Sequence, residues 1–129
     1  HRILSVSPMD SYAACFTFLA SGIGGIQIGI DWTQSLANNQ DGVIDRVWGG
    51  SLGGHSLSLV GYSDRRDSFG RQYLWMHNSH GTGWGNQGWA EVAPVVINNW
   101  IQSAYPGEFM GVSDLQEYTR RFIDLSLLA

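Results

Sequence analysis

Hydrophobic and polar residues are interleaved most clearly in two segments near the middle of the chain. In Ser56–Tyr62 apolar residues alternate with serines, and Arg71–Asn78 is rich in aromatic and apolar side chains. Both patterns are typical of β-strands. The segment between them, SDRRDSFG, has the composition of a turn. The sequence therefore predicts a β-hairpin with its tip near Arg66–Asp67.

The position of this tip fixes which residues of the two strands face one another. Counting outward pairs the leucines of the first strand with apolar residues of the second, Leu57 with Met76 and Leu59 with Leu74. The same register places His55 opposite Asn78, with cross-strand Cβ atoms about 5 Å apart. We therefore expect an apolar face that ends in a histidine held by an asparagine.

Upstream of the hairpin, the pattern predicts an edge strand, a helix and a strand with one buried face. Residues 1–7 alternate weakly before Pro8, and Asp10 or Ser11 can cap a helix that runs to about Ala20. Isoleucines then alternate with Gln27, Gly29 and Asp31 over residues 26–31. Residues 33–54 show no periodicity and are expected to be a loop-rich insertion.

Downstream of the hairpin, the chain is expected to finish in one strand and two helices. The strand continues from Trp89 to Ala93, where Pro94 ends it, and Val95–Ala104 has a helical pattern. YPGEF is expected to be a turn, and Ser113–Arg121 a short helix capped by Ser113 or Asp114.

Composition limits the classes of protein to which the chain can belong. Its 129 residues suffice for a single folded domain, and 43% of them are hydrophobic. A net charge of −4 gives no support to nucleic-acid binding, and no run approaches the roughly 18 apolar residues of a membrane helix. The start, HRILSVSPMD, lacks the apolar stretch of a signal peptide and suggests a processed product or part of a longer chain. A single cysteine leaves the compartment undecided.

Two segments resemble a known family. GGHSLSLVGY and YLWMHNSHGTGWGNQGW are similar, in residue type, order and spacing, to the histidine and asparagine blocks of the papain-like cysteine peptidases. GGIQIGID resembles, more weakly, the strand that precedes the histidine block in that family. The resemblance implies the second half of the papain-like fold, which carries the histidine and asparagine.

The resemblance also implies roles for individual residues. His55 would hold and deliver the proton, and Asn78 would orient the imidazole. Trp84 matches a tryptophan that lines the substrate cleft, although core packing explains it equally well. His80 stands where the family has a tryptophan that shields the histidine–asparagine bond from water. Residues bordering the substrate pocket would be Gly29, Gly54 and Ser56.

A catalytic thiol is missing from the expected place. The family carries its cysteine in the first half of the fold, in a segment that nothing in this chain resembles. The only thiol, Cys15, lies in the predicted first helix and is interpreted as a buried, inert side chain.

Other chemistries find little support in the sequence. His77 and His80 are three apart, so on a strand they would point to opposite faces, and neither has an acidic or cysteine partner at ligand spacing. The glycines of GIGG precede a strand, unlike those of a phosphate-binding loop. We expect neither a metal nor a cofactor.

These observations predict an α+β fold, an antiparallel β half-barrel with one packed helix, followed by a helical or irregular C-terminal extension. The expected domains are a His/Asn half-domain over 1–93 and an extension over 94–129 packed on it. The expected partner is a complementary cysteine-bearing half, from the same precursor or a separate chain, acting with this chain on peptide or protein substrates. No membrane or nucleic-acid partner is expected.

Two hypotheses for function remain open. One is the His/Asn portion of a cysteine peptidase, whose thiol comes from the complementary half; the chain alone would be inactive. Transfer of the acyl group to an amine instead of water would use the same residues. The other is a catalytically silent papain-like module with an assembly role in a larger complex such as a virion. A virion, secretion or a lysosome-like compartment would each fit one of these hypotheses.

Overall fold

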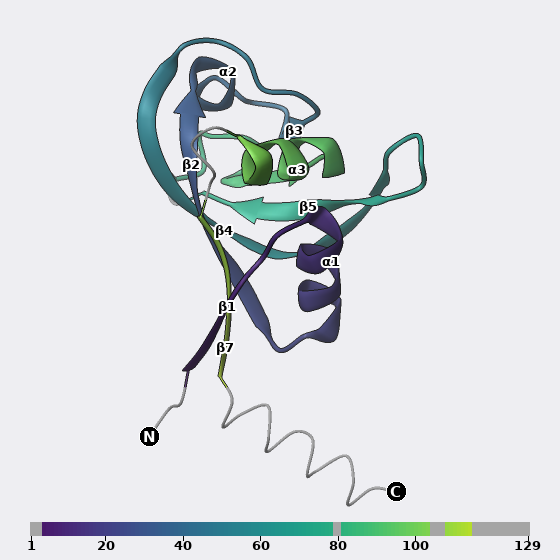
Figure 1. Ribbon diagram of the computed structural model, residues 1–129. Helices are drawn as coiled ribbons and strands as arrows, with labels where there is room; N and C mark the ends of the chain where they lie inside the picture. Colours follow the sequence, from purple (N-terminus) through teal and green to yellow (C-terminus); the bar gives the residue numbers. More distant parts are fainter. Residues whose placement is uncertain (1–3, 79–80, 104–107, 115–129) are drawn as a thin grey trace, which may run out of the picture.

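A seven-stranded, mostly antiparallel sheet forms the scaffold of the protein in a computed structural model that describes residues 4–78, 81–103 and 108–114 (Figure 1). The strand order is β1-β7-β2-β4-β5-β6-β3, and only β3 and β6 pair in parallel. The strands are β1 Leu4–Pro8, β2 Gly24–Thr33, β3 Val43–Ile44, β4 Ser51–Arg66, β5 Gln72–His77, β6 Trp89–Val92 and β7 Glu108–Asp114. The expected strands over 26–31 and from Trp89 onward are confirmed.

Three helices accompany the sheet in the described part of the chain: α1 Tyr12–Ser21, α2 Gln34–Ala37 and α3 Pro94–Gln102. As predicted, the Ser11 side chain caps α1, accepting a hydrogen bond from the backbone N–H of Ala14 at 3.0 Å. Gly22 ends this helix at φ 72°, a left-handed conformation that glycine adopts without strain. The helix predicted from Val95 is α3, which begins at Pro94.

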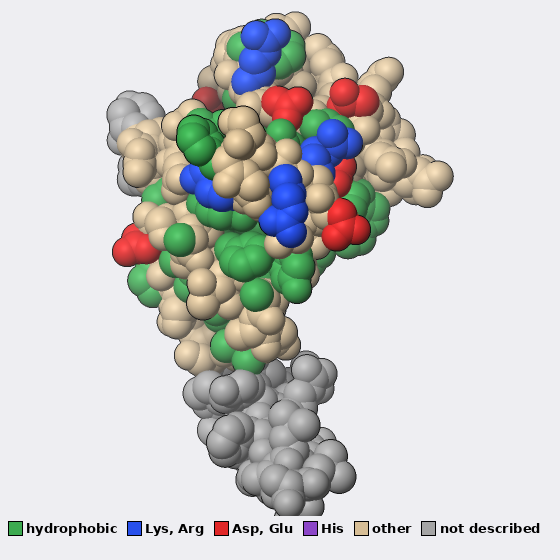
Figure 2. Space-filling model, turned by 90° about the vertical axis from the view of Figure 1, so that its right-hand side faces the viewer, with side chains coloured by type: hydrophobic (Ala, Val, Ile, Leu, Met, Phe, Trp, Pro, Cys, Tyr) green, Lys and Arg blue, Asp and Glu red, His purple; other side chains and the backbone are tan. Residues whose placement is uncertain are grey.

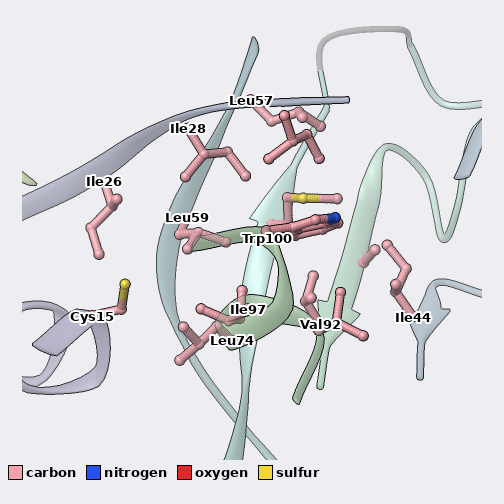
Figure 3. Packing of buried hydrophobic residues seen from close by; sticks show 14 of the residues in the cluster. Cys15, Ile26, Ile28, Ile44, Leu57, Leu59, Leu74, Val92, Ile97 and Trp100 are labelled. Carbon is pink, nitrogen blue, oxygen red and sulfur yellow. The ribbon is translucent and has the colours of Figure 1, made fainter. Parts of the chain in front are cut away.

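The core lies where α1 and α3 pack against the sheet. Figure 3 shows Ile26 and Ile28 of β2 facing Leu59 of β4, with Cys15 of α1 and Trp100 of α3 closing the cluster. The isoleucines of β2 are buried because successive side chains of a strand point to opposite faces. The two helices are joined by a hydrogen bond from the Tyr12 backbone N–H to Asn98 Oδ1 at 2.8 Å.

The hairpin of β4 and β5 forms, but its predicted register is wrong. Leu59 faces Met76, not Leu74, because the turn lies over residues 67–71 and two irregularities consume residues of β4. At the end of the hairpin nearest His55, the observed register differs from the predicted one by two residues. An even shift leaves every side chain on its predicted face. The four predicted apolar residues are therefore buried, namely Leu57, Leu59, Leu74 and Met76.

The insertion expected to be loop-rich contains regular structure. Residues 34–37 form α2, residues 43–44 form β3, and β4 already begins at Ser51. These elements escaped prediction because two of them are too short for periodicity to appear. The third begins in glycine-rich sequence that does not pack against the core.

The C-terminal segment also departs from prediction. Residues 108–114 are not an irregular or helical extension but strand β7, which lies between β1 and β2. Ser113 and Asp114 are therefore strand residues and cap no helix. Phe109, Gly111 and Ser113 are buried, and the residues between them are less so. This period of two was not recognised in the sequence because the segment is short and its buried residues include a glycine and a serine. The predicted turn over 105–109 is wrong at its end, because Glu108 and Phe109 belong to β7. Its first three residues, and residues 115–121 of the predicted helix, lie outside the described residues.

The observed architecture is α+β, as predicted, while the boundary at residue 93 stays a prediction. Within the described residues, no helix has the length and apolar character needed to span a membrane.

Candidate active site

His55 lies on β4 where that strand pairs with β2, directly opposite Ile30. Its imidazole is half-buried and packs on the indole of Trp32, with ring centroids 4.6 Å apart. The two ring planes are tilted by 54°, and this contact with the indole restricts the orientation of the imidazole.

Asn78 follows the last residue of β5 and is almost completely buried, with 1% of its surface exposed. Its backbone N–H donates to the carbonyl oxygen of Gly88 at 2.9 Å. Gly88 has φ 89°, and a Cβ there would lie 3.5 Å from the Asn78 oxygen and 3.3 Å from that of Gly81. A glycine therefore allows the loop to return close enough to fix Asn78.

The two side chains meet. His55 Nε2 lies 3.0 Å from Asn78 Oδ1. Because a carboxamide oxygen only accepts hydrogen bonds, Nε2 carries the proton and donates it. The bond fixes the orientation of the imidazole and assigns proton exchange with any reactant to Nδ1. Among the described residues, Asn78 Nδ2 has no acceptor.

Trp32, which packs against the histidine, is itself in contact with a second tryptophan, Trp84. The rings of Trp32 and Trp84 are 5.7 Å apart, and Trp84 Nε1 donates to the Leu36 carbonyl oxygen at 2.7 Å. Trp84 is only 6% exposed, so it packs in the core beside the site. Sequence reasoning missed Trp32, although the alternation of β2 contained the signal. Trp32 continues the series Ile26, Ile28, Ile30 on the buried face.

The three residues expected to border a substrate pocket lie together on β2 and β4. Gly29 pairs with Ser56, and Gly54 pairs with Asp31. Gly29 and Ser56 alternate with the buried Ile28 and Leu57, so they lie on the face of the sheet opposite the core.

The only thiol of the chain is sequestered from solvent. Cys15 is fully buried between α1 and β2 (Figure 3). Burial, and secondly the Asp10 carboxylate, raise the pKa of the Cys15 thiol from 9.0 to about 12. A thiol in this state is a poor nucleophile at neutral pH.

The remaining histidine candidates do not join the pair. His77 is exposed on β5, and its ring packs on Trp89 with centroids 4.5 Å apart. His80, the predicted shielding position, lies outside the described residues. Across residues 4–78, 81–103 and 108–114, no group of three His, Cys, Asp or Glu side chains is placed to hold a metal ion.

The mostly antiparallel sheet with few helices defines the class of fold as part of a papain-type architecture. The chain belongs to the papain family of cysteine proteases, whose family model matches residues 11–104. No curated protein sequence matches the chain significantly.

Solved structures of papain-type proteases share the fold. Bromelain from Ananas comosus, in complex with the E64 inhibitor, superposes with a TM-score of 0.64 at 19% identity, over 85% of this chain and 49% of bromelain. Xylellain from Xylella fastidiosa gives 0.61 at 18% identity, over 85% of this chain and 40% of its own. Procathepsin B S9 from Trypanosoma congolense gives 0.55 at 22% identity, over 88% and 34%. The chain thus spans at most about half the length of these proteases.

Proposed function

We propose that this chain is the His/Asn-bearing, half-barrel portion of a papain-like cysteine peptidase. The observation that carries the proposal is the hydrogen bond of 3.0 Å between His55 Nε2 and Asn78 Oδ1. Family membership supports it, because residues 11–104 include both side chains. In this proposal His55 is the acid–base catalyst and Asn78 is its positioning residue.

The proposed reaction needs one thiol and one water molecule. A thiolate attacks the carbonyl carbon of the peptide bond, and the imidazolium of His55 gives its proton to the leaving amine nitrogen as the C–N bond breaks. Water then attacks the carbonyl carbon of the thioester while His55 takes one of its protons, and the C–S bond breaks to release the carboxylic acid product and restore the thiolate and the imidazolium. The bond from Nε2 to Asn78 leaves these transfers to Nδ1.

The thiol has to come from a segment beyond this chain. Cys15 is buried in the core, and the pKa of its thiol is about 12. The chain covers 49% of bromelain, so a comparable length of a papain-type protease has no counterpart here. We propose that a complementary half, from the same precursor or from an associated chain, supplies the nucleophile.

The same proposal gives the chain a share of the substrate pocket. Gly29 and Ser56 are cross-strand neighbours, and Gly54 lies two residues before Ser56 on β4. Residues this small leave room beside the sheet for a substrate side chain, in keeping with the protein substrates that the family implies.

A thiol-directed epoxide inhibitor tests the proposal on the native protein together with its complementary segment. Mass spectrometry should locate the label on a cysteine of that segment, and peptide hydrolysis should stop in proportion to labelling. Label on Cys15, or hydrolysis that continues after complete labelling of the complementary segment, would contradict the proposal.

A second candidate is a catalytically silent module that keeps the papain-like shape for assembly. The observation that favours it is the buried Cys15, because this chain contributes no nucleophile of its own. The complementary segment decides between the two. Serine, alanine or glycine in place of its cysteine would support the silent module, and a glycine- and tryptophan-flanked cysteine would support the enzyme.

A further inference from the structure

A polar hollow lies in the segment that joins β2 to β4. Its volume is about 570 Å³, within the usual range for small-molecule sites. The lining comes from α2, from the turn that follows α2, and from both sides of β3, and it includes neither His55 nor Asn78. We call this hollow the insertion pocket. Its lining includes Gln34, Ser35, Leu36, Gln40, Arg46 and Trp48.

An exposed indole forms part of the wall of the insertion pocket. Trp48 has 60% of its surface exposed, whereas tryptophan is highly buried on average. Both backbone polar atoms of Trp48 are fixed by Ser35: the N–H donates to Ser35 Oγ at 3.0 Å, and the carbonyl oxygen accepts from the Ser35 N–H at 3.2 Å. The indole is therefore held at the surface by its own backbone.

A guanidinium fixes the ring of Trp48. The Cζ atom of Arg46 lies 4.9 Å from the centroid of the indole, a cation–π contact. Figure 2 shows a basic side chain against hydrophobic atoms at the top of the molecule, the end that carries α2 in Figure 1. Because the ring is still 60% exposed beside this cation, much of it is available to a ligand without a change of rotamer.

Two carboxamides of the pocket have no partner within the described part of the chain. The side chains of Gln34 and Gln40 are exposed and form no hydrogen bond with another described residue. The Asn39 carboxamide, in contrast, is used by the turn itself, since it donates to the Val43 carbonyl oxygen at 3.0 Å. A carboxamide both donates and accepts hydrogen bonds. Gln34 and Gln40 can therefore bond hydroxyl groups, which also do both.

The charged groups of the pocket do not favour an ionised ligand. Asp45 Oδ1 accepts from the Tyr73 hydroxyl at 2.5 Å. Asp41 Oδ1 accepts from the Val43 N–H at 2.9 Å. These two carboxylates accompany the single guanidinium in the lining, which already packs on the indole. A phosphate or another strongly anionic group is therefore disfavoured, and a neutral polar ligand fits best.

A sugar ring has the required properties. Its hydroxyl groups both donate and accept hydrogen bonds, and the C–H groups on one face of the ring pack on an indole. We propose that the insertion pocket binds a neutral saccharide, which packs on Trp48 and bonds Gln34 and Gln40 through its hydroxyl groups. This inference does not depend on the proposed peptidase function.

The position of the pocket admits a sugar from two sources. Leu36 lines the pocket, and its carbonyl oxygen accepts from Trp84, which contacts Trp32 beside His55. A saccharide here is thus close to the candidate site without occupying it. Free saccharides and glycans attached to a protein share the chemistry that the pocket recognises, and the experiment distinguishes them.

An array of immobilised neutral and acidic glycans, probed with the native protein, tests the site. We expect binding to a group of neutral glycans. Trp48→Ala should weaken that binding at least about tenfold, because the ring loses its packing on the sugar. Phe69→Ala is the matched control, since Phe69 is 83% exposed on the turn between β4 and β5 and should not affect binding. Both variants should keep the thermal midpoint of the native protein.

A second pair of variants tests the hydrogen bonds. Gln34→Leu keeps the approximate volume of the side chain and removes its polar atoms, so binding of the same glycans should weaken about threefold to tenfold. Gln102→Leu, at an exposed glutamine of α3, should leave binding unchanged. Absence of binding to any neutral glycan, binding to acidic glycans only, or equal binding by Trp48→Ala and the native protein would each overturn the proposal.

The source of the sugar is decided with one glycoprotein that carries the preferred glycan. Equal affinity for the free oligosaccharide and for the glycoprotein would show that the sugar alone is recognised. Affinity for the glycoprotein at least tenfold higher would show that an attached glycan is the natural ligand. Undiminished binding after enzymatic removal of the glycan would overturn the proposal. His55→Ala should bind glycans like the native protein, so failure of the peptidase function leaves this result intact.

Discussion

At the scale of single residues, the environment of His55 combines an aromatic support with one directed hydrogen bond. Trp32 lies 4.6 Å from the imidazole, and Asn78 Oδ1 accepts the proton of Nε2 at 3.0 Å. An imidazole held in this way presents Nδ1 in a defined direction without the entropy loss of ordering it during the reaction. Trp32 and Asn78 therefore contribute by orienting the His55 imidazole. Substitutions can distinguish this contribution from an effect on folding.

If the proposed peptidase function is correct, we expect His55→Ala to lower kcat at least about a hundredfold, the lower range for removal of an acid–base catalyst. The half-buried ring contributes little to the core, so the far-UV circular dichroism spectrum and the thermal midpoint should change little. Hydrolysis rates with a fluorogenic peptide provide the measurement. Full activity in the variant would exclude His55 from the chemistry.

Asn78→Ala removes the acceptor that orients His55. We expect kcat to fall at least about tenfold while KM stays unchanged, because orientation matters in the reacting complex and not in substrate binding. Asn78→Asp keeps an acceptor oxygen and should recover part of the loss. Asn38→Ala, at an exposed asparagine, is the matched control. An equal rise in KM, or no recovery with Asp, would indicate a purely structural role.

Cys15 should react far more slowly with thiol reagents in the folded protein than after unfolding. Its pKa is raised from 9.0 to about 12, so at pH 8 the thiolate fraction is about a thousandfold lower than that of a free thiol. Since burial favours the neutral thiol, native reactivity should increase with pH up to about 12. Alkylation rates at pH 7–10, with and without denaturant, check this. Rapid native labelling near pH 7 would make Cys15 a candidate nucleophile.

At the scale of elements, β2 and β7 approach so closely that one position admits only glycine. An ideal Cβ on Gly24 would lie 1.9 Å from the Val112 carbonyl oxygen, a backbone atom that cannot rotate away. Gly24 pairs with Ser113 at the end of the ladder that holds β7 in the sheet. The close pairing of β2 and β7 thus requires a residue without a side chain at position 24.

We expect Gly24→Ala to reduce the free energy of unfolding by about 1–3 kcal/mol, the usual range for overpacking. Gly50→Ala is the matched control, because nothing lies within 4 Å of a Cβ at that position. Its effect should stay within about 0.5 kcal/mol. Urea denaturation followed by tryptophan fluorescence measures both. Equal effects of the two substitutions would show that the approach of β2 and β7 is not constrained at this point.

Elements with a strong period could be predicted from the sequence, and the positions that join them could not. Leu57 and Leu59 alternate with serines, so their buried face was correct even though their partners on β5 were wrong. The bulges in β4 leave no signal in residue type, and they decide the register. His55 and Asn78 still meet, because the loop from Gly81 to Gly88 fixes Asn78 after the ladder has ended.

Trp32 and β7 were missed for different physical reasons. Trp32 continues a visible alternation, and its position beneath His55 follows once β2 is extended by two residues. In β7 the inward residues include Gly111 and Ser113, whose small or polar side chains give no hydrophobic signal. Pairing on both edges stabilises this strand, and pairing partners distant in sequence are not encoded locally.

At the scale of the whole molecule, the sheet has two faces with different uses. One packs against α1 and α3 to form the core and carries His55 and Asn78, and the other exposes Val60 and Trp89 beside Ser56 and Ser58. Exposed apolar patches on a folded domain commonly mark interfaces. The candidate site therefore lies on the core face, just beyond the end of the β4–β5 ladder.

The place of β7 also bears on how the polypeptide acquires its shape during synthesis. Leu4 pairs with Asp114, so the first described strand meets its neighbour only after 110 further residues have left the ribosome. Until then β2 lacks a neighbour on one edge, and β1 has none among the described strands. Closing so long a loop is slow, and unpaired edges favour aggregation. Completion of the native sheet therefore has to wait until β7 has emerged from the ribosome.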